Sequence, residues 1–145
     1  MEKIENTQTR YWYVGHIYND EDSQRSRFVK EGVWEAWFND KAIGQRQLKL
    51  AKKIKKGDIV IIKSSFTKGT NHDIPCVRIF AIGEVTSEEG SIRKEETWTI
   101  ASYKVNYFWQ GQEDFNDPEY NIYQRIIYEC KNIEIVNYIN SVRNA

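Results

Sequence analysis

Apolar residues recur at every second position in two stretches of this chain, and this period limits the possible folds more than any other feature. The first stretch covers residues 77–85 and the second covers residues 103–109. Side chains of a β-strand point alternately to its two faces, so a period of two predicts strands with one buried face. Gly83 in the first stretch predicts a bend or bulge of the kind that closes a sheet into a barrel.

Further strands and helices are expected around these two strands. Strands are predicted at residues 11–14, at 59–62 in a continuous apolar run that suits burial on both faces, and at 122–128. Helices are predicted before Gly32, over residues 41–54 with a basic face, and over residues 133–142. Residues 33–38 are expected to form an aromatic-rich connector, residues 63–65 to leave the buried strand, and residues 88–102 to form a polar loop. The predicted fold class is α+β: a curved mixed β-barrel of about five or six strands with two or three peripheral helices.

The length of 145 residues predicts one domain, here residues 11–145, after a flexible N-terminus of residues 1–10. Aromatic residues make up 14% of the chain, which is more than a core of this size needs, so some rings are expected to line a pocket. Lys plus Arg and Asp plus Glu both number 21, so the chain has no net field that attracts a phosphate backbone. Any contact with nucleic acid must therefore be local.

Several classes of protein are disfavoured by what the sequence lacks. Two cysteines and two histidines without ligand spacing predict neither a disulfide framework nor a metal site, and no cofactor is expected. No phosphate-binding glycine loop or nucleophile elbow is present, and Ser64 and Ser65 have no base that the sequence makes visible. A non-enzymatic protein is therefore expected. With no apolar run of membrane-spanning length and no signal peptide, it is expected in the cytoplasm rather than at a membrane.

A set of short motifs in a fixed order carries a resemblance to known families. Gly-Val-Trp at residues 32–34 resembles the YTH readers of modified RNA, in which a Trp at this point forms one wall of an aromatic cage. Together with Lys-Gly-Asp-Ile-Val at 56–60, Lys-Ser-Ser at 63–65 and Ala-Ile-Gly-Glu-Val at 81–85, it also resembles EVE domains. The order is most similar to the EVE-like N-terminal domains of McrB-type, modification-dependent restriction GTPases. The resemblance covers roughly residues 11 to 110 and implies a PUA-like (EVE/YTH-like) fold.

The resemblance implies a pocket for a modified base with Trp34 as one wall and Trp98 as a second. Stacking of a base on an aromatic ring contributes about 1 to 3 kcal/mol. Donors and acceptors for the edge of the base are expected from the loop that holds His16 and Ile17, and from the pair that follows the buried strand, Ser64 and Ser65. Glu35 is a candidate acceptor for an exocyclic amine.

Each of these residues also has a structural interpretation. The rings at positions 34, 37 and 38 lie at helical spacing and would plug the barrel, and Trp98 would pack on the barrel as a lid. Glu35 would be solvated or paired with arginine, and His16 would bond to backbone. The sequence leaves these alternatives open.

Basic side chains are concentrated between residues 46 and 68. We expect contacts to phosphates that flank an extruded base from six of them: Arg46, Lys49, Lys53, Lys56, Lys63 and Lys68. A solvated helix face explains most of this concentration equally well.

The function expected from these observations is that of a specificity domain. It would bind DNA that carries a methylated or otherwise modified base, flip that base into the pocket and read it by stacking and edge contacts. A fused or associated McrB-type GTPase and a nuclease subunit would supply catalysis. Two alternatives remain: a standalone EVE-like reader of modified RNA, and a small enzyme that acts on a nucleotide or on RNA.

Overall fold

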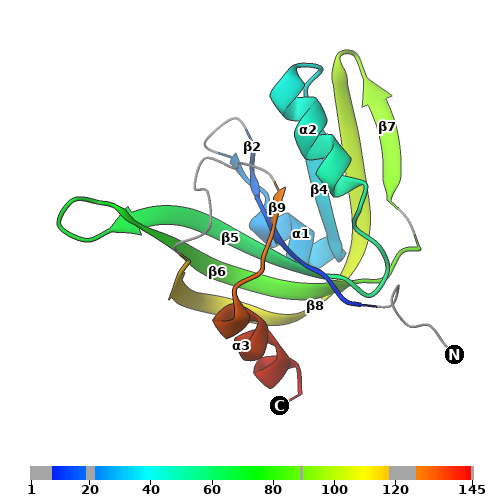
Figure 1. Cartoon of the computed structure of the whole chain (residues 1–145). Helices are drawn as coiled ribbons and strands as arrows, with labels where there is room; N and C mark the ends of the chain where they lie inside the picture. Colours follow the sequence, from blue (N-terminus) through cyan, green and yellow to red (C-terminus); the bar gives the residue numbers. More distant parts are fainter. Residues whose placement is uncertain (1–7, 19–21, 89, 118–126, 145) are drawn as a thin grey trace, which may run out of the picture.

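A curled, seven-stranded mixed sheet forms the centre of the fold (Figure 1). The computed structural model describes residues 8–18, 22–88, 90–117 and 127–144. The strands of this sheet are β1 (Tyr11–Val14), β4 (Val33–Phe38), β5 (Ile59–Lys68), β6 (Ile74–Val85), β7 (Ser91–Glu95), β8 (Trp98–Asn116) and β9 (Ile127–Glu129). Their order is β4-β8-β6-β5-β1-β9, and β7 pairs with β8. Only the β1–β5 pair is parallel among these described strands.

The long strand β8 gives the sheet its curl, because it pairs with β4 and β7 through its first part and with β6 through its second. The register between β6 and β8 shifts twice, between Ile79 and Ala81 and between Ile82 and Gly83. A Cβ atom at Gly83 would lie 2.4 Å from Cγ1 of Val105, so only glycine allows the two strands to approach this closely. The bulge predicted at Gly83 is therefore confirmed.

Three helices pack on the sheet in the described residues: α1 (Arg25–Glu31), α2 (Ala42–Ala51) and α3 (Ile133–Arg143). α1 ends at Gly32, which adopts the left-handed conformation with φ 68°, as predicted. α2 contacts β4, and Oε1 of its Gln47 accepts a 2.8 Å hydrogen bond from the backbone N–H of Ile127 in β9. Thus α2 spans the gap between the two ends of the curled sheet, which forms a half-barrel.

The sheet has a hydrophobic core on each face, and α3 packs on the opposite side of the sheet from α1 and α2 (Figure 1). Val60 and Ile62 belong to one core, whereas Ile59 and Ile61 belong to the other. All four side chains have no exposed surface. The prediction that residues 59–62 form a strand buried on both faces is confirmed.

Three local predictions were wrong. Residues 33–38 form strand β4 rather than a connector, because they pair along their whole length with β8. β5 continues to Lys68 instead of ending before residues 63–65, because β6 supplies a partner for every residue of this extension. Most of the expected loop at residues 88–102 is the hairpin of β7 and β8, with Trp98 as the first residue of β8. In each case the partner strand is what the local sequence could not reveal.

The C-terminal part of the chain follows the predictions where it is described. α3 covers the expected terminal helix, and Oδ1 of Asn132 caps it by accepting hydrogen bonds from the N–H groups of Glu134 and Ile135 at 2.9 and 3.2 Å. Of the expected strand at residues 122–128, the last two residues belong to β9, and residues 122–126 lie outside the described residues. No helix in the described ranges has the length and apolar character needed to cross a membrane.

Candidate functional site

The parallel pairing of β1 with β5 brings two predicted site residues together. Tyr11 lies opposite Ile59 and Val14 lies opposite Ile62, so the chain leaves the end of β1 beside the middle of β5, which continues to Lys68. His16 follows β1 and Ser64 lies in β5 just beyond the paired residues. As a result, Nε2 of His16 is 3.2 Å from Oγ of Ser64. These two residues, with Ser23, Arg25 and Phe80, are called the His16 cluster below.

Both ring nitrogens of His16 take part in hydrogen bonds. Nδ1 is 3.0 Å from Oγ of Ser23, the residue that ends β3 (Asp22–Ser23), and the imidazole is 5% exposed. Its ring meets the ring of Phe80 edge to face, with centroids 5.6 Å apart. The guanidinium of Arg25 lies over the same Phe80 ring at 3.9 Å. The cluster therefore combines hydroxyl groups, an imidazole and a ring that also contacts a cation.

The His16 imidazole is neutral at physiological pH. Burial first, and then the positive charges of Arg25 and Lys63, lower its pKa from 6.5 to about 4. A neutral imidazole has one donor and one acceptor nitrogen, and a serine hydroxyl can serve either role. The hydrogen-bonded chain Ser23–His16–Ser64 can therefore adapt to a ligand that presents either a donor or an acceptor.

The other two residues of the Lys-Ser-Ser motif, Lys63 and Ser65, contact each other. Ser65 follows Ser64 in β5, and side chains of successive strand residues point to opposite faces. Oγ of Ser65 accepts a 3.0 Å hydrogen bond from Nζ of Lys63. Lys63 is 6% exposed, and burial lowers its pKa to about 8. Of the two predicted serines, the structure thus joins Ser64 to His16 and Ser65 to Lys63, and it places Lys63 away from the surface.

Trp34 lies in the core behind the His16 loop. Its side chain has no exposed surface and stacks on Tyr103, with centroids 6.3 Å apart and ring planes at 21°. Nε1 of Trp34 donates a 3.0 Å hydrogen bond to the carbonyl oxygen of Gly15, the residue before His16. In this structure Trp34 braces the loop that carries His16 and presents no ring face to solvent.

Trp98 lies on another part of the sheet. It is 39% exposed and meets Trp37, which is 36% exposed, edge to face at 6.2 Å. Trp34 and Trp37 are three residues apart in β4 and therefore point to opposite faces of the strand. The structure does not bring Trp34 and Trp98 together as two walls of one pocket. Phe38 is completely buried, as the interpretation as a barrel plug expects.

Glu35 and Ile17 complete the predicted pocket residues. The Glu35 carboxylate lies 2.9 Å from Nη2 of Arg27 and 3.7 Å from Nη1 of Arg93, which matches its alternative interpretation as an arginine-paired side chain. Glu35 points to the face of β4 opposite to that of Trp34. Ile17 pairs through its backbone with Ser23 in the small β2–β3 sheet, where β2 is Ile17–Tyr18; its side chain lies outside the described residues.

The remaining basic residues of the predicted phosphate surface are spread over several elements. Arg46 and Lys49 lie exposed on α2, and Lys53 lies exposed just after it. Lys56 forms a 3.1 Å ion pair with Glu88, and Lys68 lies exposed at the end of β5, where the β5–β6 hairpin extends away from α2 (Figure 1).

Sequence reasoning missed three members of the His16 cluster: Ser23, Arg25 and Phe80. Phe80 carried a weak signal. It is a large ring, and it falls between the regularly spaced apolar positions of residues 77–85 rather than on one of them. Ser23 and Arg25 carried none. In the described part of the chain, no three His, Cys, Asp or Glu side chains gather as metal ligands.

Comparisons with known proteins add no assignment. A scan against protein-family models and a search of the curated proteins both gave no match to this chain. The candidate site is therefore argued from the geometry of its own residues.

Proposed function

We propose that this protein is a non-enzymatic reader of a modified nucleobase in nucleic acid, and that the base is read at the His16 cluster. The observation that carries this proposal is the neutral His16 imidazole, fixed between two serine hydroxyls just beyond the end of β1 and beside β5. The edge of a nucleobase presents neutral donors and acceptors to its reader. Neutral groups that can reverse their hydrogen bonds match such an edge without leaving a buried charge unpaired.

Aromatic and cationic groups beside these hydroxyls support the same ligand class. Phe80 is half-buried and offers a flat apolar surface next to His16, with Arg25 against its ring. Base readers use such rings for stacking and arginine for stacking or phosphate contact. Trp34 has no exposed surface in this structure, so a role as a stacking wall requires a rearrangement that uncovers its ring.

The wider setting of the proposal follows from the resemblance of residues 11–110. The curled mixed sheet, with the three helices of the described residues, is compatible with a PUA-like (EVE/YTH-like) domain. We propose that the domain acts in the cytoplasm as the specificity module of a modification-dependent restriction system. It would bind DNA, and a McrB-type GTPase with a nuclease partner would supply catalysis. A standalone reader of modified RNA is the alternative that the same pocket chemistry allows.

The direct test is equilibrium binding to matched oligonucleotides. Strands that carry methylcytosine, hydroxymethylcytosine or methyladenine are compared with unmodified strands of the same sequence, both as DNA and as RNA. A preference for one modification supports the proposal, and the polymer that shows it decides between DNA and RNA. Equal affinity for every modified strand and its control would exclude a reader function.

Ser64→Ala is expected to reduce the preference for the modified strand about tenfold, because it removes a hydroxyl whose net hydrogen-bond contribution is about 1 kcal/mol and disturbs His16. The measurement is the ratio of the dissociation constants for unmodified and modified strands. Ser65→Ala is the matched control, because this neighbouring hydroxyl points to the other face of β5 and binds Lys63. If both variants lower the ratio equally, the base does not lie on the His16 side of the strand.

One observation favours a second candidate, a small hydrolytic enzyme. The 3.2 Å separation between Nε2 of His16 and Oγ of Ser64 is that of a serine nucleophile and its general base. In this arrangement Nδ1 of His16 faces a hydroxyl, whereas the usual serine triad places a carboxylate there. Covalent labelling by a fluorophosphonate that is lost in Ser64→Ala would support the enzyme, and absence of labelling in the folded wild-type protein would exclude an activated Ser64.

A further inference from the structure

A second surface feature lies at the opposite end of β1 from the His16 cluster. It is a groove of about 900 Å³ that is lined by residues from four separate parts of the chain. They are the segment that leads into β1 with the first residue of that strand, the segment between α2 and β5, the end of β9 with the two residues after it, and the first part of α3. The groove therefore exists only in the folded chain.

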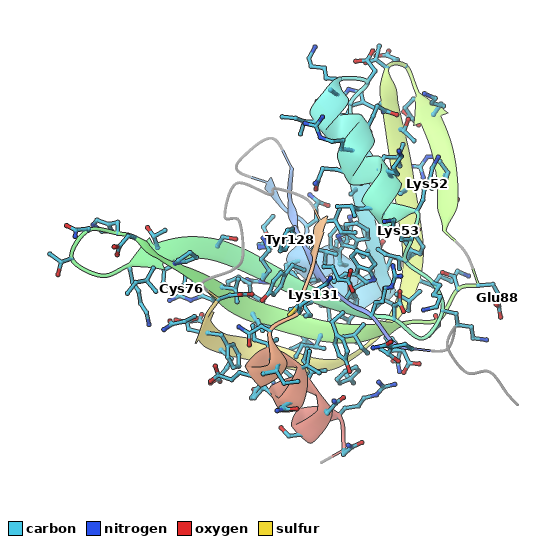
Figure 2. The ribbon with its side chains drawn as sticks, viewed as in Figure 1. Lys52, Lys53, Cys76, Glu88, Tyr128 and Lys131 are labelled. Atoms are coloured by element: carbon cyan, nitrogen blue, oxygen red, sulfur yellow. The ribbon has the colours of Figure 1, made fainter. Side chains whose placement is uncertain are left out.

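The groove is strongly basic although the protein has no net charge. Four cationic side chains line it, Arg10, Lys53, Lys55 and Lys131, against the single carboxylate of Glu129. Figure 2 labels Lys53 after α2 and Lys131 after β9, which shows how distant in sequence these contributions are. Because one face collects cations while the total is balanced, this groove has a local positive field that the composition does not reveal.

Most of this charge is available to a ligand. Lys55 is engaged, since its Nζ lies 3.1 Å from Oδ1 of the buried Asp58 and donates to the carbonyl of Gln8. Within the described ranges, the side chains of Arg10, Lys53 and Lys131 are exposed and form no ion pair. Among the described residues, three cations that form no ion pair thus line one groove.

The position of the groove relates it to the His16 cluster. Arg10 and His16 are separated by six residues along β1 and its continuation, which corresponds to about 20 Å of extended chain. Duplex DNA rises about 3.4 Å per base pair, so the same distance covers about six base pairs. A duplex whose modified base occupied the His16 cluster would be long enough to reach the groove with its backbone.

We propose that the groove lined by Arg10, Lys53 and Lys131 binds the phosphodiester backbone of the nucleic acid whose base is read at the His16 cluster. The inference rests on the proposed function for its ligand. This groove differs from the phosphate surface expected from the sequence. Only Lys53, among the six residues of that expected surface, also lines the groove. The contribution of the groove is independent of sequence and modification, since phosphate contacts position a nucleic acid without reading its bases.

The test is the salt dependence of DNA binding by a triple variant, Arg10→Gln, Lys53→Gln and Lys131→Gln. Binding of a 20-base-pair duplex, with and without one central modified base, is measured over a range of salt from about 50 to 200 mM. Loss of three phosphate contacts is expected to make the slope of log K against log salt shallower by about 2.7. The ratio of wild-type to variant affinity should therefore shrink about 40-fold across this range.

A matched triple variant controls for net charge: Lys30→Gln, Lys94→Gln and Lys104→Gln, all exposed and outside the groove. It should keep the wild-type slope, and the groove variant should keep the wild-type ratio of affinities for modified and unmodified duplexes. An unchanged slope in the groove variant, an equal loss in the control, or no measurable duplex binding by the wild-type protein would overturn the inference. Absence of any preference for the modified duplex would instead defeat the reader function, while the slope on unmodified DNA still decides the role of the groove.

Discussion

Replacing Trp34 with alanine is expected to lower the free energy of unfolding by about 3 to 5 kcal/mol. The indole has no exposed surface, stacks on Tyr103 and donates a hydrogen bond to the carbonyl of Gly15. The substitution would leave a cavity in the core and an unpaired carbonyl in the loop that carries His16. Equilibrium denaturation by urea, followed by circular dichroism, measures the change.

Trp37→Ala is the matched control, because it removes the same side chain three residues along β4 on the opposite face. Trp37 is 36% exposed, so its loss is expected to cost less than half as much. If the free energy of unfolding of Trp34→Ala is within about 1 kcal/mol of the wild-type value, Trp34 is not a core residue in solution. That result, with a lost preference for modified strands, would favour the role of Trp34 as a wall of the base pocket.

Stability is expected to fall by up to about 3 kcal/mol as the pH decreases from 6.5 to about 4, because of His16. Folding lowers the pKa of this imidazole from 6.5 to about 4, so the unfolded chain binds the proton more tightly than the folded protein does. The contribution of His16 is complete above pH 6.5 and is lost as the pH falls through this window. Urea denaturation at several pH values measures it.

His16→Gln isolates this effect from the titration of carboxylates, which the variant shares with the wild-type protein. The difference in unfolding free energy between the two proteins should change between pH 4 and 6.5 and be constant from pH 6.5 to 7.5. Lys63 does not interfere, because its lowered pKa of about 8 places its own contribution in the alkaline range. A constant difference over the whole acid range would mean that the His16 imidazole is not buried in solution.

Periodicity and turn residues predicted the elements whose structure is determined locally. The alternation in residues 77–85 and 103–109 became β6 and part of β8, and the apolar run at 59–62 became the doubly buried part of β5. Gly32 and Gly83 act where the sequence placed them, because a left-handed cap and a close strand approach both exclude a Cβ atom. These features need little information about distant residues.

The predicted site was assembled only in part, because sequence spacing cannot assign side chains to faces of a curled sheet. Trp34 and Glu35 were expected in one pocket. As neighbours in a strand they point to opposite faces, so Trp34 lies in the core and Glu35 forms ion pairs with arginines. This period could not be applied to them, since residues 33–38 also fit helical spacing and their partner, β8, begins 60 residues after Phe38. Trp98 was placed in a loop for the same reason.

The sequence alone predicted a curved mixed barrel with two or three peripheral helices, showed many aromatic residues and no net charge, and placed His16 and Ser64 among the residues of one expected pocket. Only the tertiary structure showed that His16 and Ser64, which lie 48 positions apart, contact each other directly, and that Arg10, Lys53 and Lys131 line one groove. The physical reason is the parallel pairing of β1 with β5. Parallel strands need a long crossover, and their register depends on packing between distant residues, so no local pattern reveals which side chains meet next to the paired residues.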